Sequence, residues 1–125
     1  MQNFIKAQTT KSPRVNMDVQ KGLIELKGSS IMENSRAFYE PILAWIYEYI
    51  KTPKNTLVHI EFEYFNSSSA VALLSILKAV AKVKKAGFEL IIEWCYHKDD
   101  DDMKESGENY ALLIDADFNL IEKVN

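Results

Sequence analysis

The strongest constraint on the fold is an abrupt change of hydrophobic period at residues 66–69. Before it, TLVHIEFEYF (56–65) alternates apolar and polar residues, many of them β-branched or aromatic, which is typical of a strand. After it, the apolar residues of SAVALLSILKAVAKVKK recur every three or four positions, which predicts a helix over about 68–85. A strand that passes directly into a helix indicates a sheet with helices packed against it.

Strand and helix patterns alternate on both sides of this unit. The other expected elements are two or three strands within 3–27, helices over about 35–51 and 100–112, and strands at 88–96 and 118–124. Pro41 either kinks the first helix or marks its first turn. The near-continuous apolar run of 88–96 predicts a central strand covered on both faces. We expect one α/β domain over residues 1–125, with helices packed on an open mixed sheet.

Composition excludes several classes of function. The 125 residues carry a net charge of −3 and are 47% hydrophobic, which indicates a globular protein without the basic surface of a nucleic-acid binder. A lone cysteine, Cys95, cannot form an internal disulfide and favours a reducing compartment. The chain opens without an apolar signal segment, and no stretch approaches the roughly 18 apolar residues of a membrane helix. We expect a cytoplasmic protein with neither a nucleic-acid nor a membrane partner.

The junction residues Asn66, Ser67, Ser68 and Ser69 allow more than one interpretation. A helix begins with backbone N–H groups that lack intrahelical partners, and an Asn or Ser side chain can cap one of them, contributing about 1 kcal/mol. The same helix start would tolerate a phosphoryl group on Ser67, because negative charge is stabilised there. It could also hold a small anion without a covalent bond. Capping, modification and anion binding all remain open on these residues alone.

Three stretches of the chain favour modification. They are ENSRAFYEPILAWIYEYI (33–50), EFEYFNSSSAVALLSIL (61–77) and EWCYHKDDDDMKESGE (93–108). Together, and in this order, they resemble the SiaC family of bacterial regulatory phosphoproteins, whose fold is similar to STAS domains and anti-sigma-factor antagonists. With the intervening residues, the resemblance covers about residues 20–120. It implies a STAS-like fold for the whole domain.

The resemblance also implies a mechanism. The family's phosphoacceptor follows the asparagine, which maps onto Ser67; the family more often has threonine there, and Ser68 is the alternative acceptor. A serine/threonine kinase and a matching phosphatase are implied, with an effector that binds the unmodified form and is released on phosphorylation. In the best-known branch the effector is a diguanylate cyclase, which points to cyclic di-GMP signalling and biofilm control. We therefore predict a regulatory adaptor without a cofactor, and not an enzyme.

The partner surface is expected at the helix start and in two neighbouring segments. The residues are Asn66, Ser68, Ser69, Asn34, Phe38, Tyr39, Asp101 and Asp102. Phe38 and Tyr39 would be interface anchors if exposed, whereas Trp45, Tyr49 and Trp94 are expected in the core. The acidic run at 99–102 lacks the spacing of an EF-hand and is expected to be a solvated helix start that contributes to the interaction surface.

The two histidines, His59 and His97, are not expected to form a site. No cysteine, second histidine or carboxylate lies at metal-ligand spacing from them, so no zinc site is expected. Ser67, His59 and Asp100 have the residue types of a Ser–His–Asp catalytic triad, but the sequence has no G-x-S-x-G nucleophile elbow to support one. The glycines occur singly, and no glycine-rich phosphate loop is present. Hydrolysis is therefore the least favoured alternative.

Overall fold

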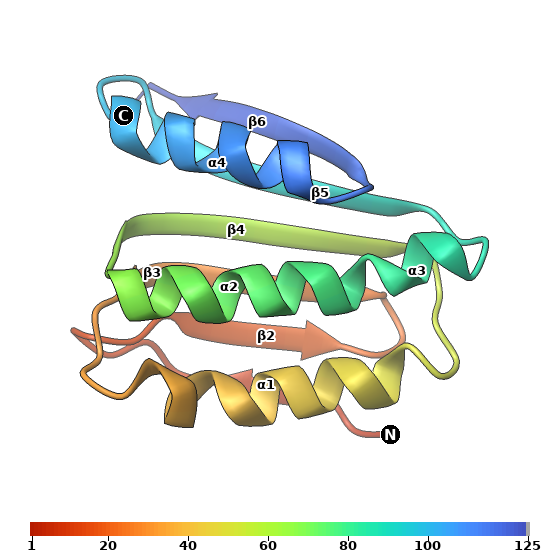
Figure 1. Cartoon of the computed structure of the whole chain (residues 1–125). Coiled ribbons are helices and arrows are strands. Elements are labelled where there is room, and N and C mark those ends of the chain that lie inside the picture. The colour runs from red at the N-terminus through yellow and green to blue at the C-terminus, as the bar shows by residue number, and fades with distance from the viewer. Residues whose placement is uncertain (125) are drawn as a thin grey trace.

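The computed structural model describes residues 1–124, and its strands form one six-stranded sheet in sequence order (Figure 1). The strands are β1 (Phe4–Lys6), β2 (Arg14–Asp18), β3 (Leu23–Ser30), β4 (Thr56–Phe65), β5 (Leu90–His97) and β6 (Asp117–Lys123). The first three strands pair antiparallel, whereas β3, β4, β5 and β6 pair parallel. The sheet is therefore mixed, as the sequence predicts.

The helices are α1 (Ser35–Tyr49), α2 (Ser67–Val80), the short α3 (Lys82–Lys85) and α4 (Asp101–Leu113). Figure 1 shows α1, α2 and α4 side by side on one face of the sheet. We call the other face of the sheet the open face. Within residues 1–124, no helix combines the length and the apolar character needed to cross a bilayer. The predicted α/β class, with helices packed on a mixed sheet, is confirmed.

Three helices begin at the same end of the sheet, where the parallel strands have their carboxyl termini. Because β3, β4 and β5 run parallel, the helix that follows each of them begins at the same edge (Figure 1). Each start has a side-chain cap: Asn34, Asn66 and Asp100 accept backbone N–H bonds at 3.1, 2.9 and 3.0 Å. Such caps satisfy donors that the helix itself leaves unpaired. The polar junctions of the sequence therefore assemble at the carboxyl edge of the parallel strands.

The core fills the space between the helices and the inner face of the sheet. Val58, Ile60 and Phe62 alternate inward along β4, and burial of each such side chain stabilises the fold by about 1.5–3 kcal/mol. Trp45, Tyr49 and Trp94 are also buried, which confirms their expected place in the core. Gly107 lets α4 approach the sheet closely, since a Cβ there would lie 2.5 Å from the Trp94 ring.

Two details of the predicted elements are wrong, and the structure excludes one of the two roles that the sequence leaves open for Pro41. The helix expected over 68–85 breaks at Ala81 into α2 and α3. Helix α1 begins at Ser35 and continues through Pro41, so the proline does not mark its first turn. Strand β5 is not covered by helices on both faces. On the open face, side chains of β4 and β6 flank Glu93 and partly bury it.

Candidate regulatory site at the start of α2

Asn66 fixes the start of α2 to the end of β3. Its Oδ1 accepts hydrogen bonds from Ser69 N at 2.9 Å and from Ser68 Oγ at 3.1 Å. Its Nδ2 donates to Met32 O at 3.0 Å, and its backbone N–H donates to Ser30 O at 3.0 Å. Both the oxygen and the nitrogen of the side chain thus help to position the helix, which is the capping role that the sequence indicates.

The three adjacent serines have different environments. Ser69 is 1% exposed; its Oγ donates to Ser30 O at 2.9 Å and lies 3.0 Å from Ser35 Oγ. Ser68 is exposed but bonds to Ser35 Oγ at 2.8 Å as well as to the cap. Ser67 is exposed, and within residues 1–124 no group forms a hydrogen bond with its Oγ. Of the three hydroxyls, that of Ser67 is both accessible and unengaged.

Below the surface, four hydroxyl groups form what we call the hydroxyl cluster. Its members are Ser30, Ser35, Tyr39 and Ser69. Ser30 Oγ lies 2.6 Å from Tyr39 Oη and donates to Ser69 Oγ at 2.7 Å. Burial raises the pKa of Tyr39 to about 12, although its hydrogen bond with Ser30 opposes that shift. The cluster is therefore neutral, and it joins β3, α1 and α2.

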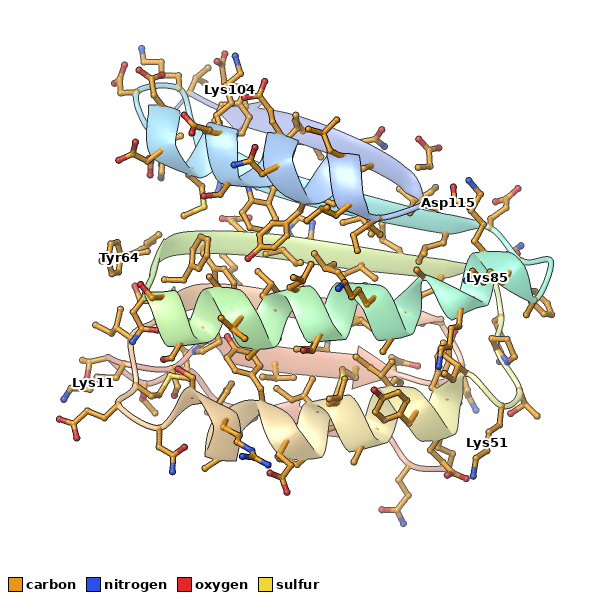
Figure 2. The ribbon with its side chains drawn as sticks, in the orientation of Figure 1. Lys11, Lys51, Tyr64, Lys85, Lys104 and Asp115 are labelled. Atoms are coloured by element: carbon orange, nitrogen blue, oxygen red, sulfur yellow. The ribbon has the colours of Figure 1, made fainter. Side chains whose placement is uncertain are left out.

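Two hollows flank the serines. Ser67 lines a hollow of about 270 Å³ between the end of β4 and the starts of α2 and α4. Three carboxylates, those of Glu63, Asp100 and Asp102, also line it, and its described lining holds no lysine, arginine or histidine. Tyr64, labelled in Figure 2, projects from the end of β4 beside this helix start. Ser67 therefore faces an acidic surface.

Ser68 lines a different hollow, a groove of about 620 Å³ between α1 and α2. Its lining is largely apolar and includes Leu43, Val71 and Ala72. Val71 is 69% exposed, so it adds an accessible apolar side chain to this groove. The groove begins one residue from Ser67, so a protein bound along it would also meet the start of α2.

The structure separates the predicted partner residues into surface and interior. Asn34, Asp101 and Asp102 are exposed in or next to the first turns of their helices, and Asp102 borders the hollow at Ser67. Phe38 is half-buried, with the Lys6 ammonium 4.9 Å from its ring.

Tyr39 does not meet the condition for an interface anchor, which was that its side chain be exposed. Tyr39 is 3% exposed, because its position on α1 faces the interior and its hydroxyl bonds to Ser30. Ser69 is also unavailable for direct contact with a partner, since it is buried in the hydroxyl cluster. Both residues lie beneath the surface and support the residues that form it.

The Ser–His–Asp triad does not assemble. Ser67 and Asp100 line the same hollow, but His59 points to the open face of the sheet. There His59 Nδ1 lies 2.8 Å from a carboxylate oxygen of Glu93. The sheet therefore lies between the histidine and the serine that it would have to activate.

The fold brings possible metal ligands to His59 although their spacing in the sequence does not predict a site. One ligand atom each from His59, Glu61 and Cys95 lie within 4.8 Å of one another. His59 and Glu61 are two residues apart on one strand and so share a face, which the sequence could have indicated. Cys95 joins them only through the pairing of β4 with β5, in which it lies opposite Glu61. No sequence pattern gives that register.

Comparison with known proteins agrees with this architecture. A family model described as SiaC family regulatory phosphoprotein matches residues 6–123. That match places the chain in the class of regulatory phosphoproteins. It belongs to the SiaC family, as the three sequence stretches indicate.

The similar proteins come from Pseudomonas aeruginosa. An uncharacterised protein of strain UCBPP-PA14 is 23% identical over 103 residues, which cover 82% of each chain. The crystal structure of apo-SiaC has a TM-score of 0.84 at 22% identity and covers 99% of this chain and 100% of its own. The structure of the diguanylate cyclase SiaD in complex with its activator SiaC has a TM-score of 0.84 at 20% identity, covering 98% and 99%. At these identities the structures support the fold alone.

Proposed function

We propose that this protein is a non-enzymatic adaptor that binds and regulates an effector protein while Ser67 is unmodified. The main observation behind this proposal is that the Ser67 hydroxyl is exposed at a helix start and forms no hydrogen bond within the described part of the chain. The chain also belongs to a family of regulatory phosphoproteins. A kinase can reach this oxygen without opening the hydroxyl cluster beneath it. The neighbouring Ser68 and Ser69 hydroxyls would first have to break hydrogen bonds.

A diguanylate cyclase is the proposed class of effector. A relative with the same fold is described as the activator of such a cyclase and is bound to it. On this chain we propose that the effector contacts the groove between α1 and α2, together with the exposed start of α2. The proposed contact residues are Asn34, Phe38, Asn66, Ser68, Asp101 and Asp102. We add Val71, because its side chain is exposed in the groove.

Phosphorylation would act through local charge. A phosphoryl group on Ser67 adds nearly two negative charges beside the carboxylates of Glu63, Asp100 and Asp102. The unpaired N–H groups at the helix start stabilise the dianion on this protein, so the fold tolerates it. An effector that fits the neutral surface would instead have to desolvate the new charge. A difference of about 3 kcal/mol in binding free energy weakens affinity more than a hundredfold.

Binding of a free small anion is not supported by this surface. The helix start supplies N–H donors, but three carboxylates line the hollow beside it. Like charges disfavour an anion that is not held covalently. The acidic lining therefore favours a covalent phosphate, added and removed by enzymes, over a reversibly bound one. We propose that a cognate serine/threonine kinase and a phosphatase do this in the cytoplasm, where ATP is the phosphate donor.

The first test maps the phosphoacceptor. The full-length protein and its Ser67→Ala and Ser68→Ala variants are incubated with extract from the host cells and ATP, and intact masses are measured. We expect one added phosphate on the wild type and on Ser68→Ala, and none on Ser67→Ala. A phosphate that persists on Ser67→Ala and disappears from Ser68→Ala would assign the switch to the other serine.

The second test measures effector release. A diguanylate cyclase from the same genome is immobilised, and binding of unmodified, phosphorylated and Ser67→Asp protein is compared. We expect loss of binding on phosphorylation and a partial loss for Ser67→Asp, which carries a single charge. The Ser67→Ala variant is the matched control and should bind like the wild type. Equal binding by the phosphorylated and unmodified forms would contradict release by charge.

A further inference from the structure

The open face of the sheet carries a compact group of polar side chains that the regulatory site does not use. His59 and Glu61 project from β4, and their paired residues Glu93 and Cys95 project from β5. Lys27 on β3 and Lys123 on β6 contact the Glu61 carboxylate from either side. We call these six residues the charged cluster. It lies on the opposite side of the sheet from Ser67.

The hydrogen bonds of His59 leave one nitrogen in an unusual environment. Nδ1 lies 2.8 Å from Glu93 Oε1, so the Nδ1–H group donates a hydrogen bond to this carboxylate. Nε2 lies 3.3 Å from Glu61 Oε1 and 3.9 Å from Cys95 Sγ. In a neutral ring that donates from Nδ1, Nε2 carries a lone pair directed at a carboxylate oxygen. Two such acceptors repel each other unless a cation, either a proton or a metal ion, lies between them.

We propose that His59, Glu61 and Cys95 bind a divalent transition-metal ion, with zinc as the best match, and that Glu93 orients the His59 ring. Nitrogen, oxygen and sulfur ligands together suit zinc, and three protein ligands leave a fourth position for solvent. A carboxylate behind a ligating histidine is a recurrent feature of zinc sites.

The separations of the ligand atoms fit a tetrahedral ion. Zinc bonds of about 2.0–2.2 Å to N and O and about 2.3 Å to S place N and O about 3.4 Å apart, and N and S about 3.6 Å apart. The observed separations from His59 Nε2 are 3.3 Å to Glu61 Oε1 and 3.9 Å to Cys95 Sγ. All three ligand atoms lie within 4.8 Å of one another, so small movements of these side chains would bring them to the separations that zinc requires.

Metal binding at this site would release a proton. Burial, followed by the charges of Glu61 and Glu93, raises the pKa of the Cys95 thiol to about 11, so the metal-free thiol keeps its proton. A zinc ion deprotonates a coordinating thiol outright. The S–H bond breaks, the sulfur lone pair forms the S–Zn bond, and the proton passes to the buffer. Proton release is therefore a signature that distinguishes thiolate ligation from loose binding to surface carboxylates.

Lys27 and Lys123 should lower the affinity for a metal ion, but they do not occupy the Glu61 oxygen that would bind it. Both ammonium groups contact Glu61 Oε2, whereas Oε1 faces His59. Their positive charges repel a metal ion, and Lys27 is the more exposed of the two, at 51% of its side chain. Lys27→Gln should therefore bind zinc more tightly than the wild type.

The test uses untagged full-length protein, because a histidine tag would bind the metal itself. Zinc chloride is titrated calorimetrically in two buffers of different ionisation enthalpy, and Co²⁺ replaces zinc for absorption spectra. We expect one ion per chain, release of about one proton, and a thiolate-to-cobalt charge-transfer band. Glu93→Gln should weaken binding by about tenfold to a hundredfold.

Matched variants decide the outcome. His59→Gln and Cys95→Ser should each weaken zinc binding by at least as much as Glu93→Gln, whereas His97→Gln, at the end of the same sheet face, should bind like the wild type. Cys95→Ala is the second substitution if Cys95→Ser fails to fold, and circular dichroism checks each variant. The proposal is overturned if the wild type does not bind zinc, if His59→Gln binds it equally well, or if the cobalt complex lacks the thiolate band.

Discussion

The hydroxyl cluster and the charged cluster lie on opposite faces of the sheet and stabilise the protein in different ways. The hydroxyl cluster is neutral and buried, and its members bond to one another and to the Ser30 backbone. The charged cluster is in contact with solvent; His59 and Glu61 keep 22% and 18% of their side chains exposed. Removing a partner in a dry cluster leaves an unsatisfied polar group, whereas water replaces a partner at the surface.

This difference suits each cluster to a separate role. The hydroxyl cluster joins β3, α1 and α2 with bonds that do not titrate near neutral pH, so it gives Ser67 a rigid support. The proposed phosphate on Ser67 would lie outside the cluster and would leave these bonds intact. The charged cluster is sensitive to salt and cations because its carboxylates and lysines are charged and partly exposed. The substitutions below test this contrast in order of decreasing expected effect.

Ser69→Ala should be the most destabilising of these substitutions. It removes the donor to Ser30 O and the acceptor for Ser30 Oγ in a buried setting, at a cost of about 1–3 kcal/mol in the free energy of unfolding. Urea denaturation monitored by circular dichroism measures the loss. Ser67→Ala is the control and should change stability by less than about 0.5 kcal/mol, since its hydroxyl is exposed and unengaged. Equal losses for the two variants would remove the distinction between buried and exposed serines.

Tyr39→Phe should cost somewhat less, about 0.5–1.5 kcal/mol, because the ring remains and only the bond to Ser30 is lost. Since the pKa of Tyr39 is about 12, the loss should be the same at any pH where the protein is stable. Tyr39 and Ser69 share Ser30 as a partner, so the double variant should be non-additive by about 0.5 kcal/mol or more in urea denaturation. Simple additivity would mean that the hydroxyls act independently.

The two clusters also differ in how far the sequence predicts them. The change of period at Asn66 predicts the strand, the helix and the cap between them, because all three depend on local residues. The acceptor position stays a prediction that rests on the family resemblance. The burial of Ser69 does not follow locally, since its partner Ser30 is 39 residues away on another strand. The meeting of His59 with Cys95 requires the register of β4 with β5, which hydrophobic pattern does not specify.

Glu61→Gln tests the charged cluster and should cost less than about 1 kcal/mol at neutral pH. Burial alone would raise the pKa of Glu61, but hydrogen bonds with Lys123 and His59 and the charges of Lys123 and Lys27 lower it. A lowered pKa means that the carboxylate stabilises the fold above its unfolded value of about 4.3, and that this contribution is lost as the pH falls through the folded value.

The difference in stability between wild type and Glu61→Gln should therefore shrink below about pH 4 and also with added salt. Chemical denaturation across pH measures it. Glu63→Gln, two residues further along the same strand and exposed, is the control for removing a carboxylate and should cost less than Glu61→Gln at neutral pH. A difference that grows as the pH falls would mean that the folded pKa of Glu61 is raised.

Arg14→Ala should have the smallest effect, under about 0.5 kcal/mol in the free energy of unfolding. Arg14 pairs with Glu25 on the open face of the antiparallel strands, and 47% of its side chain is exposed. Water and salt replace most of what such a pair contributes, and ordering a long side chain offsets part of the rest. Urea denaturation at low and high salt measures the loss, which should vanish at high salt. A salt-independent loss as large as that of Tyr39→Phe would mean that exposure does not decide the strength of polar contacts in this protein, and the contrast between the two faces of the sheet would fail.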